Sequence, residues 1–212
     1  MKLYYITDRR QFKGDRHEQE RRLLNKIAEC AAAGVDLIQL REKDMTAQAL
    51  AELAVKAMAA LSGSKTRLLI NGRTDVALAS RAHGVHLPGN DLPASEVRAI
   101  FARAGVNNPL IGVSAHSAAG VASAEAHGAD FAVFAPVFEK GGNASRDGLE
   151  QLRGICHRMG SAQPAMPVLA LGGITLENAQ QCVAAGAAGI GAIRLFQENN
   201  VDSIVERLRK II

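Results

Sequence analysis

The sequence predicts an α/β fold, a single (β/α)8 (TIM) barrel formed by one domain that spans residues 1–212. Short apolar runs typical of buried strands alternate with longer helical patterns along the chain. There are eight such runs, the number that closes a parallel barrel, and the last two have glycine-rich ends, at the place where barrels of this kind bind phosphate. An open, doubly wound parallel sheet is the alternative fold.

The strands are predicted from continuous apolar runs, because strands of a parallel sheet are buried on both faces. Eight runs have this composition: Leu3–Thr7, Val35–Leu40, Arg67–Asn71, Gly84–Leu87, Leu110–Ala115, Phe131–Val137, Val168–Leu171 and Gly189–Ile193.

The helices are predicted from helical spacing of apolar residues between these runs, as in Leu50, Leu53, Ala57 and Leu61. The predicted helices are Glu18–Ala33, Ala47–Leu61, Ala94–Ala104, Ala118–His127, Leu149–Met159, Leu176–Ala185 and Val201–Ile212. Three of them run into Gly34, Gly128 and Gly186, which are expected to cap their carboxyl ends.

The composition is 48% hydrophobic and 22% charged, which is ordinary for a globular protein. The formal net charge of +4 is spread along the chain, so it fits an anionic substrate or a plain solvated surface and argues against nucleic acid as a partner. No stretch approaches a membrane span, and the first residues lack the apolar run of a signal peptide. Cys30, Cys156 and Cys182 predict free thiols in a reducing compartment, so a cytoplasmic location is expected.

Glycines at the ends of the last two predicted strands indicate a phosphate site. Glycine has no Cβ, so the backbone N–H groups can approach a ligand closely. Two such strand ends side by side form a phosphate cradle. The candidate residues are Gly172, Gly173, Gly191, Ala192 and Ile193. The alternative is that these glycines only permit tight turns.

Polar residues at the carboxyl ends of the other strands are the candidates for chemistry, since barrel enzymes place their active residues there. Gln39, Arg41 and Lys43 alternate along the second strand and so share a face if the strand continues. An arginine and a lysine together suit a phosphate or diphosphate. The alternative is a surface salt-bridge network that involves Glu42 and Asp44.

Four further candidates follow strands three, four and five. Asn71 would bind a heterocycle or cap the next helix, and Asp91 would bind Mg²⁺ or simply form a turn. Ser114 and His116 are expected to point the same way at the end of strand five. A histidine at a barrel mouth is a candidate acid or base, although many such histidines are structural.

These motifs, in their order and spacing, resemble the thiamine phosphate synthase family, which includes a sister branch that tautomerises the thiazole precursor. The resemblance covers nearly the whole chain and rests on Tyr5-Ile6-Thr7-Asp8, Gln39-Leu40-Arg41-Glu42-Lys43, Leu69-Ile70-Asn71, Gly84-Val85-His86-Leu87, Ile111-Gly112-Val113-Ser114, Gly128-Ala129-Asp130 and Leu171-Gly172-Gly173-Ile174. It implies a (β/α)8 barrel and a small phosphorylated thiazole or pyrimidine substrate. The composition already argues against a nucleic-acid or membrane partner. A homodimer is the assembly considered.

The synthase branch joins a pyrimidine diphosphate to thiazole phosphate and expels pyrophosphate. The resemblance implies that Gln39, Arg41 and Lys43 serve the diphosphate, and that Asn71 and Asp91 match the family's asparagine and second metal aspartate. That reaction uses Mg²⁺ to screen the charge of the leaving group.

This chain departs from the synthase pattern at two places. Gly72 stands where the family carries the other metal aspartate. The loop after strand six, expected as a mobile lid, carries Glu139-Lys140-Gly141-Gly142 in place of a Thr-x-Thr-Lys clamp.

The tautomerase branch resembles this chain at Asn71-Gly72-Arg73, at Ser114-Ala115-His116-Ser117 and at Gly148-Leu149-Glu150. There a histidine, matched by His116, moves a proton on the thiazole ring, with Ser114 beside it and with no cofactor required. We therefore expect a metal-independent thiazole tautomerase, an isomerase. The alternatives are the Mg²⁺-dependent synthase, for which the motif from Gln39 to Lys43 speaks, and a non-catalytic binder of thiazole or thiamine phosphate.

Overall fold

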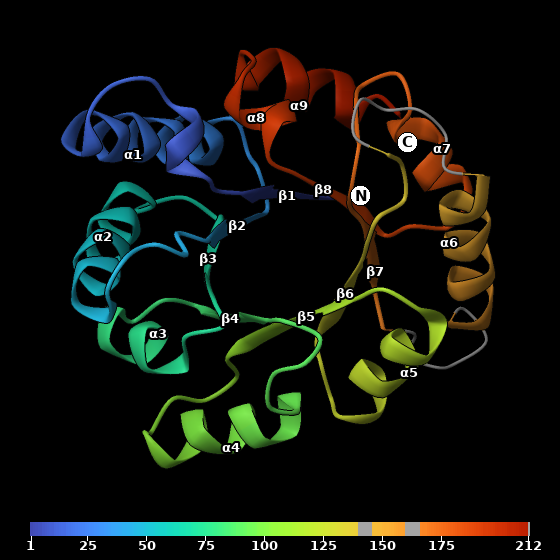
Figure 1. Ribbon diagram of the computed structural model, residues 1–212, viewed down its shortest axis with the longest axis horizontal. Helices are drawn as coiled ribbons and strands as arrows, with labels where there is room; N and C mark the ends of the chain where they lie inside the picture. The colour runs from blue at the N-terminus through green and yellow to red at the C-terminus, as the bar shows by residue number, and fades with distance from the viewer. Residues whose placement is uncertain (140–145, 160–165, 212) are drawn as a thin grey trace.

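The computed structural model describes residues 1–139, 146–159 and 166–211. Its eight strands form a closed parallel barrel in chain order, in which β8 pairs with β1 (Figure 1). The helices lie in a ring around the outside of the strands. The predicted (β/α)8 barrel is confirmed, and the open sheet considered as its alternative is wrong.

The strands are β1 (Lys2–Ile6), β2 (Leu37–Leu40), β3 (Arg67–Asn71), β4 (Gly84–Leu87), β5 (Leu110–Ala115), β6 (Phe131–Phe134), β7 (Val168–Ala170) and β8 (Gly189–Ala192). The α-helices are α1 (Arg16–Ala32), α2 (Ala47–Ala60), α3 (Thr74–Ser80), α4 (Ala94–Arg103), α5 (Ala118–Ala126), α6 (Arg146–Met159), α7 (Ala179–Ala184), α8 (Arg194–Gln197) and α9 (Val201–Arg209). A short 3₁₀ helix, η1 (Arg9–Gln11), follows β1.

The main differences from the predicted elements lie at their ends and in the shortest helices. Strand β6 ends at Phe134, three residues before the predicted end, because Pro136 has no N–H for a sheet ladder. Helix α7 begins at Ala179 rather than at Leu176. Before it, the Asn178 side chain accepts the N–H of Thr175 and so stabilises a turn. Helices α3 and α8 are absent from the predicted helices, because segments this short hold too few turns to show periodicity.

Two groups of buried apolar residues divide the core. Tyr4 and Ile6 of β1, Leu69 of β3 and Phe131 of β6 belong to a small cluster from alternate strand positions, which fills the inside of the barrel. The larger cluster, which includes Tyr5, packs the outer faces of the strands against the helices. Tyr4 and Tyr5 are both fully buried, but as strand neighbours they point to opposite faces.

A buried ion-pair network ties β1 to β2 just beyond the strands. Arg9, which is 3% exposed, donates to Glu42 at 2.9 Å and to Asp44 at 2.7 Å. Thr7 donates to Glu42 as well, at 2.6 Å. Burial raises the pKa of Glu42, and the hydrogen bonds from Thr7 and Arg9 offset this only in part. Both acidic neighbours of Arg41 and Lys43 are thus bound by a different cation.

Two expectations about the rest of the chain can be compared with the structure. Cys30 and Cys182 are buried and Cys156 is half-buried, and all three are free thiols. Within residues 1–139, 146–159 and 166–211, no helix is long and apolar enough to cross a membrane.

Candidate active site

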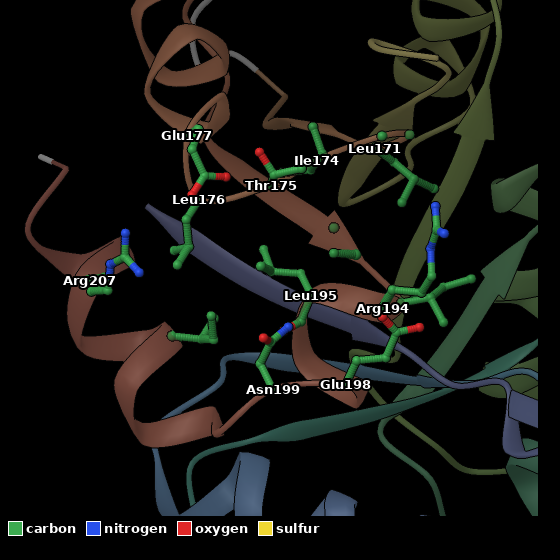
Figure 2. A pocket seen from close by; sticks show the side chains of 16 residues that line it. Leu171, Ile174, Thr175, Leu176, Glu177, Arg194, Leu195, Glu198, Asn199 and Arg207 are labelled. Atoms are coloured by element: carbon green, nitrogen blue, oxygen red, sulfur yellow. The ribbon is translucent and has the colours of Figure 1, made fainter. Parts of the chain in front are cut away.

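The glycine-rich ends of β7 and β8 lie next to each other because these two strands pair. Together with α9 they line a hollow of about 550 Å³ (Figure 2). All five predicted cradle residues line it: Gly172, Gly173, Gly191, Ala192 and Ile193. In Figure 2 the Arg194 side chain points toward Leu171, whereas Arg207 reaches the hollow from the side of Glu177.

Two glycines of the cradle are required by close packing and not only by the turn. Gly172 and Gly173 have φ values of +100° and +60°. A Cβ on Gly172 would lie 2.9 Å from the Cα of Pro136, and one on Gly173 would overlap the carbonyl oxygen of Glu139. Within the described residues, the N–H groups of Gly172 and Gly173 donate no hydrogen bond. They are available to an anion in the hollow.

A second hollow, of about 850 Å³, occupies the mouth of the barrel. It is lined by the remaining predicted site residues: Gln39, Arg41, Lys43, Asn71, Asp91, Ser114 and His116. Leu171 and Ile193 line both hollows, so the two form adjoining parts of one site. The structure therefore brings every predicted site residue to the carboxyl end of the barrel. Each hollow has a volume within the range of about 300–1,000 Å³ that is typical of small-molecule sites.

Arg41 and Lys43 supply positive charge to the second hollow. Neither forms an ion pair with any residue that the structure describes, since Arg9 takes both Glu42 and Asp44. Arg41 is half-buried, and its charge contributes to the low pKa of His86. Two cations without a carboxylate partner at the mouth of a barrel favour an anionic ligand.

His116 is held by a backbone carbonyl group just past the end of β6. Its Nδ1 lies 2.7 Å from the carbonyl oxygen of Ala135, which can only accept. Nδ1 therefore carries the hydrogen, and Nε2 of the neutral ring is an acceptor. An imidazole fixed in this way can take a proton from a ligand in the hollow that it lines.

Tyr4 and His86, which belong to none of the predicted site residues, connect two of those residues inside the barrel. Gln39 donates to the Tyr4 hydroxyl at 2.9 Å, and that hydroxyl lies 3.1 Å from Nδ1 of His86. Nε2 of His86 lies 2.8 Å from the Ser114 hydroxyl. The feature of the sequence that could have indicated His86 is its place as a histidine at an inward position of an otherwise apolar strand.

The metal-binding potential of the site rests on Asp91. A Cβ on Gly72 would lie 3.5 Å from Oδ2 of Asp91, so the missing carboxylate would have faced it. Oδ1 of Asp91 already accepts the N–H of Leu92 at 2.8 Å. The part of the chain that the structure describes holds no group of three or more His, Cys, Asp or Glu residues suited to a metal ion. The loop after strand six, residues 136–143, is expected as a lid, and its part from residue 140 onward lies outside the described residues.

Comparison with known proteins identifies similar sequences and structures. A family model described as thiamine monophosphate synthase matches residues 3–196. A putative thiamine-phosphate synthase of Geobacter sulfurreducens is 42% identical over 90% of this chain and 84% of its own length. A thiamine-phosphate synthase of Clostridium acetobutylicum is 36% identical over 91% of this chain and 85% of its own length. The solved thiamine phosphate pyrophosphorylase of Pyrococcus furiosus has a TM-score of 0.80 and 31% identity, and the alignment covers 99% of this chain and 94% of that one.

Proposed function

The chain belongs to the thiamine monophosphate synthase family of thiamine-biosynthesis enzymes, and from this premise we propose that it is a thiamine-phosphate synthase. It would join a pyrimidine diphosphate to thiazole phosphate. A bond forms from the thiazole ring to the carbon that carries the diphosphate, the carbon–oxygen bond to the diphosphate breaks, and pyrophosphate leaves. The names of the relatives favour this transferase over the isomerase that sequence analysis placed first.

The observation that carries the proposal is that the site offers two separate places for anions. Gly172 and Gly173, whose N–H groups donate to no described residue, line one hollow, and the cations Arg41 and Lys43 line the other. A condensation of two phosphorylated substrates needs both places, whereas isomerisation of one monophosphate needs only the first. The two hollows adjoin at Leu171, so the two reacting rings would meet there, between the anion sites.

The site offers a Mg²⁺ ion only one protein carboxylate. Asp91 would hold it by one carboxylate, and diphosphate oxygens and water would complete its ligands, since Mg²⁺ is commonly bound by one or two carboxylates together with substrate phosphates. When bound, the ion supplies charge that screens the leaving pyrophosphate. Arg41 and Lys43 share that task, since Gly72 contributes no carboxylate to a fuller metal site.

The decisive measurement is pyrophosphate release from both substrates with Mg²⁺. We expect release well above a buffer blank, and we expect Arg41→Gln to lower kcat/KM for the pyrimidine diphosphate by about 10- to 100-fold, the worth of one charge-assisted hydrogen bond. Arg67→Gln, at the opposite end of the barrel, is the control and should behave as wild type. Absence of pyrophosphate from the wild-type reaction would overturn the proposal.

A thiazole tautomerase is the second candidate, and two observations favour it. Gly72 leaves Asp91 without a carboxylate partner, and His116 presents a fixed acceptor nitrogen. Proton transfer on a thiazole phosphate would need the glycine cradle and His116, but neither the pyrimidine diphosphate nor a metal. The same assay without those two components separates the candidates, because only the isomerase would then change its substrate.

Gly72→Asp is expected to strengthen the metal site if the transferase proposal holds. The new carboxylate would face Oδ2 of Asp91, so the Mg²⁺ concentration that gives half-maximal pyrophosphate release should fall about tenfold, the effect of roughly 1.4 kcal/mol. Gly72 has φ +61°, a conformation that aspartate and asparagine tolerate. Gly72→Asn is therefore the matched control, with the same backbone and no charge. An equal response from both variants would refute a metal bound beside Asp91, and Mg²⁺-dependent melting provides a second readout.

A further inference from the structure

A chain of four buried or half-buried polar side chains crosses the inside of the barrel and opens into the active site at both ends. It runs from Gln39 through Tyr4 and His86 to Ser114, with successive distances of 2.9, 3.1 and 2.8 Å. The four residues come from β2, β1, β4 and β5. Tyr4 is fully buried, and Gln39 and His86 are each 2% exposed, so the first two links are shielded from solvent and the third, to Ser114, is half-buried.

The donor and the acceptor of each hydrogen bond in this chain of side chains can be assigned in turn. The Gln39 amide donates to the Tyr4 oxygen, which leaves the Tyr4 hydrogen in need of an acceptor. In this fully buried position the available acceptor is Nδ1 of His86. A neutral ring that accepts at Nδ1 carries its hydrogen at Nε2, so His86 donates to Ser114 Oγ. The hydrogen of the Ser114 hydroxyl is then directed elsewhere, toward the hollow that this residue lines.

His86 is kept neutral by its surroundings. Burial first, and the positive charge of Arg41 second, lower the pKa of His86 to about 3. Burial also raises the pKa of Tyr4 well above its ordinary value, so that the phenol keeps its hydrogen. The donor and acceptor roles along the chain therefore stay fixed throughout the physiological pH range.

The other end of this hydrogen-bond chain, at Gln39, also opens into the active site. Oε1 of Gln39 forms no hydrogen bond with the described residues, and it is not among their buried unpaired atoms. Since Gln39 lines the larger hollow, Oε1 is open to it as an acceptor. One end thus presents an acceptor and the other end a hydroxyl donor.

We propose that Tyr4 and His86 are positioning residues, which fix the Ser114 hydroxyl as a hydrogen-bond donor and the Gln39 amide as an acceptor toward the substrate. The kinetic part of this inference rests on the proposed transferase function. A ligand group that accepts a hydrogen bond, such as a diphosphate oxygen or a ring nitrogen, is matched by Ser114. A group that donates, such as an amino group, is matched by Gln39. Without the chain, each side chain would be free to rotate between its two roles.

The first test compares Tyr4→Phe with Tyr5→Phe. Each variant removes one buried hydroxyl from β1, and Tyr5 donates its own to Gln197 on the outer face of the barrel at 2.9 Å. We expect similar losses of melting temperature. Only Tyr4→Phe should lower kcat, by about tenfold, with KM for both substrates within about twofold. Equal kcat values for the two variants would overturn the proposal.

A rescue experiment separates positioning from packing at His86. Glutamine at position 86 can present an amide N–H to Ser114, whereas leucine cannot. We expect His86→Gln to retain at least about tenfold more kcat than His86→Leu when both are assayed well below their melting temperatures. Equal loss in the two variants would mean that the ring acts only by filling space.

The tautomer of His86 can be read without any turnover. Nitrogen-15 shifts of the imidazole in the wild-type protein should show a neutral ring with hydrogen at Nε2 from pH 5 to 8, and Tyr4→Phe should give a mixture of tautomers. A charged ring, or hydrogen at Nδ1, would contradict the proposal whatever the enzyme catalyses. A wild-type protein that shows the expected tautomer but releases no pyrophosphate would instead refute only the proposed function.

Discussion

Gly173→Ala is expected to weaken thiazole phosphate binding by about 100-fold or more and to lower the free energy of unfolding by about 2–4 kcal/mol. The methyl group would overlap the carbonyl oxygen of Glu139, and φ at this position is +60°. Relief of that overlap requires the segment after β7 that holds Gly172 and Gly173 to move, because the obstacle is a backbone carbonyl group, which cannot rotate away as a side chain can. The movement would displace the N–H groups of Gly172 and Gly173, two residues that line the hollow. Calorimetric titration with thiazole phosphate and urea unfolding measure the two effects.

Two matched glycines separate the causes of this loss. Gly34 has φ +82°, and nothing lies within 4 Å of an added Cβ, so Gly34→Ala measures the backbone strain alone, about 1 kcal/mol, with unchanged affinity. At Gly191 an added Cβ would meet the Leu171 side chain at an ordinary 3.5 Å. Gly191→Ala should therefore stay folded and lose affinity only through the space it takes from the ligand. Full affinity in Gly173→Ala would refute the cradle.

The barrel could be predicted because each strand carries its own signal. Continuous apolar runs indicate strands buried on both faces, and eight of them in a row permit few topologies. Strand ends were less certain. Residues 135–137 read as apolar continuation of β6, but the ladder stops at Phe134. Helix α3, with seven residues, and α8, with four, are too short for a periodic pattern.

The site could be predicted as a set of strand ends, because parallel strands deliver their carboxyl ends to one side of a barrel. The contacts that the residues at these strand ends make with one another and with the rest of the protein could not be predicted. Glu42 and Asp44 are sequence neighbours of Arg41 and Lys43, yet Arg9 binds both, from 33 residues away in the case of Glu42. Tyr4 and His86 are separated by 82 residues, and only closure of the barrel brings their polar atoms together. Composition and spacing carry no signal for such contacts.

His116→Gln is expected to separate the two candidate functions by the largest change in rate. In a tautomerase, the imidazole must accept a proton and return it, which glutamine cannot do, so turnover of the thiazole phosphate tautomer should fall by about 10²- to 10⁴-fold. In a synthase, the substitution removes no group that binds diphosphate, and pyrophosphate release should stay within about threefold. His157→Gln is the control, because His157 is an exposed histidine on α6 that lines neither hollow.

The two expected results differ because the two reactions make different use of the imidazole ring. Nδ1 of His116 donates to the carbonyl oxygen of Ala135, so Nε2 of the neutral ring is an acceptor and can donate only after it has taken a proton. An isomerisation that moves one proton needs a ring that first accepts a proton and then returns it. Displacement of pyrophosphate transfers no proton to the ring. Tautomer turnover that survives His116→Gln would remove this residue from the isomerase candidate. Loss of pyrophosphate release in the same variant would instead place His116 in the transferase site.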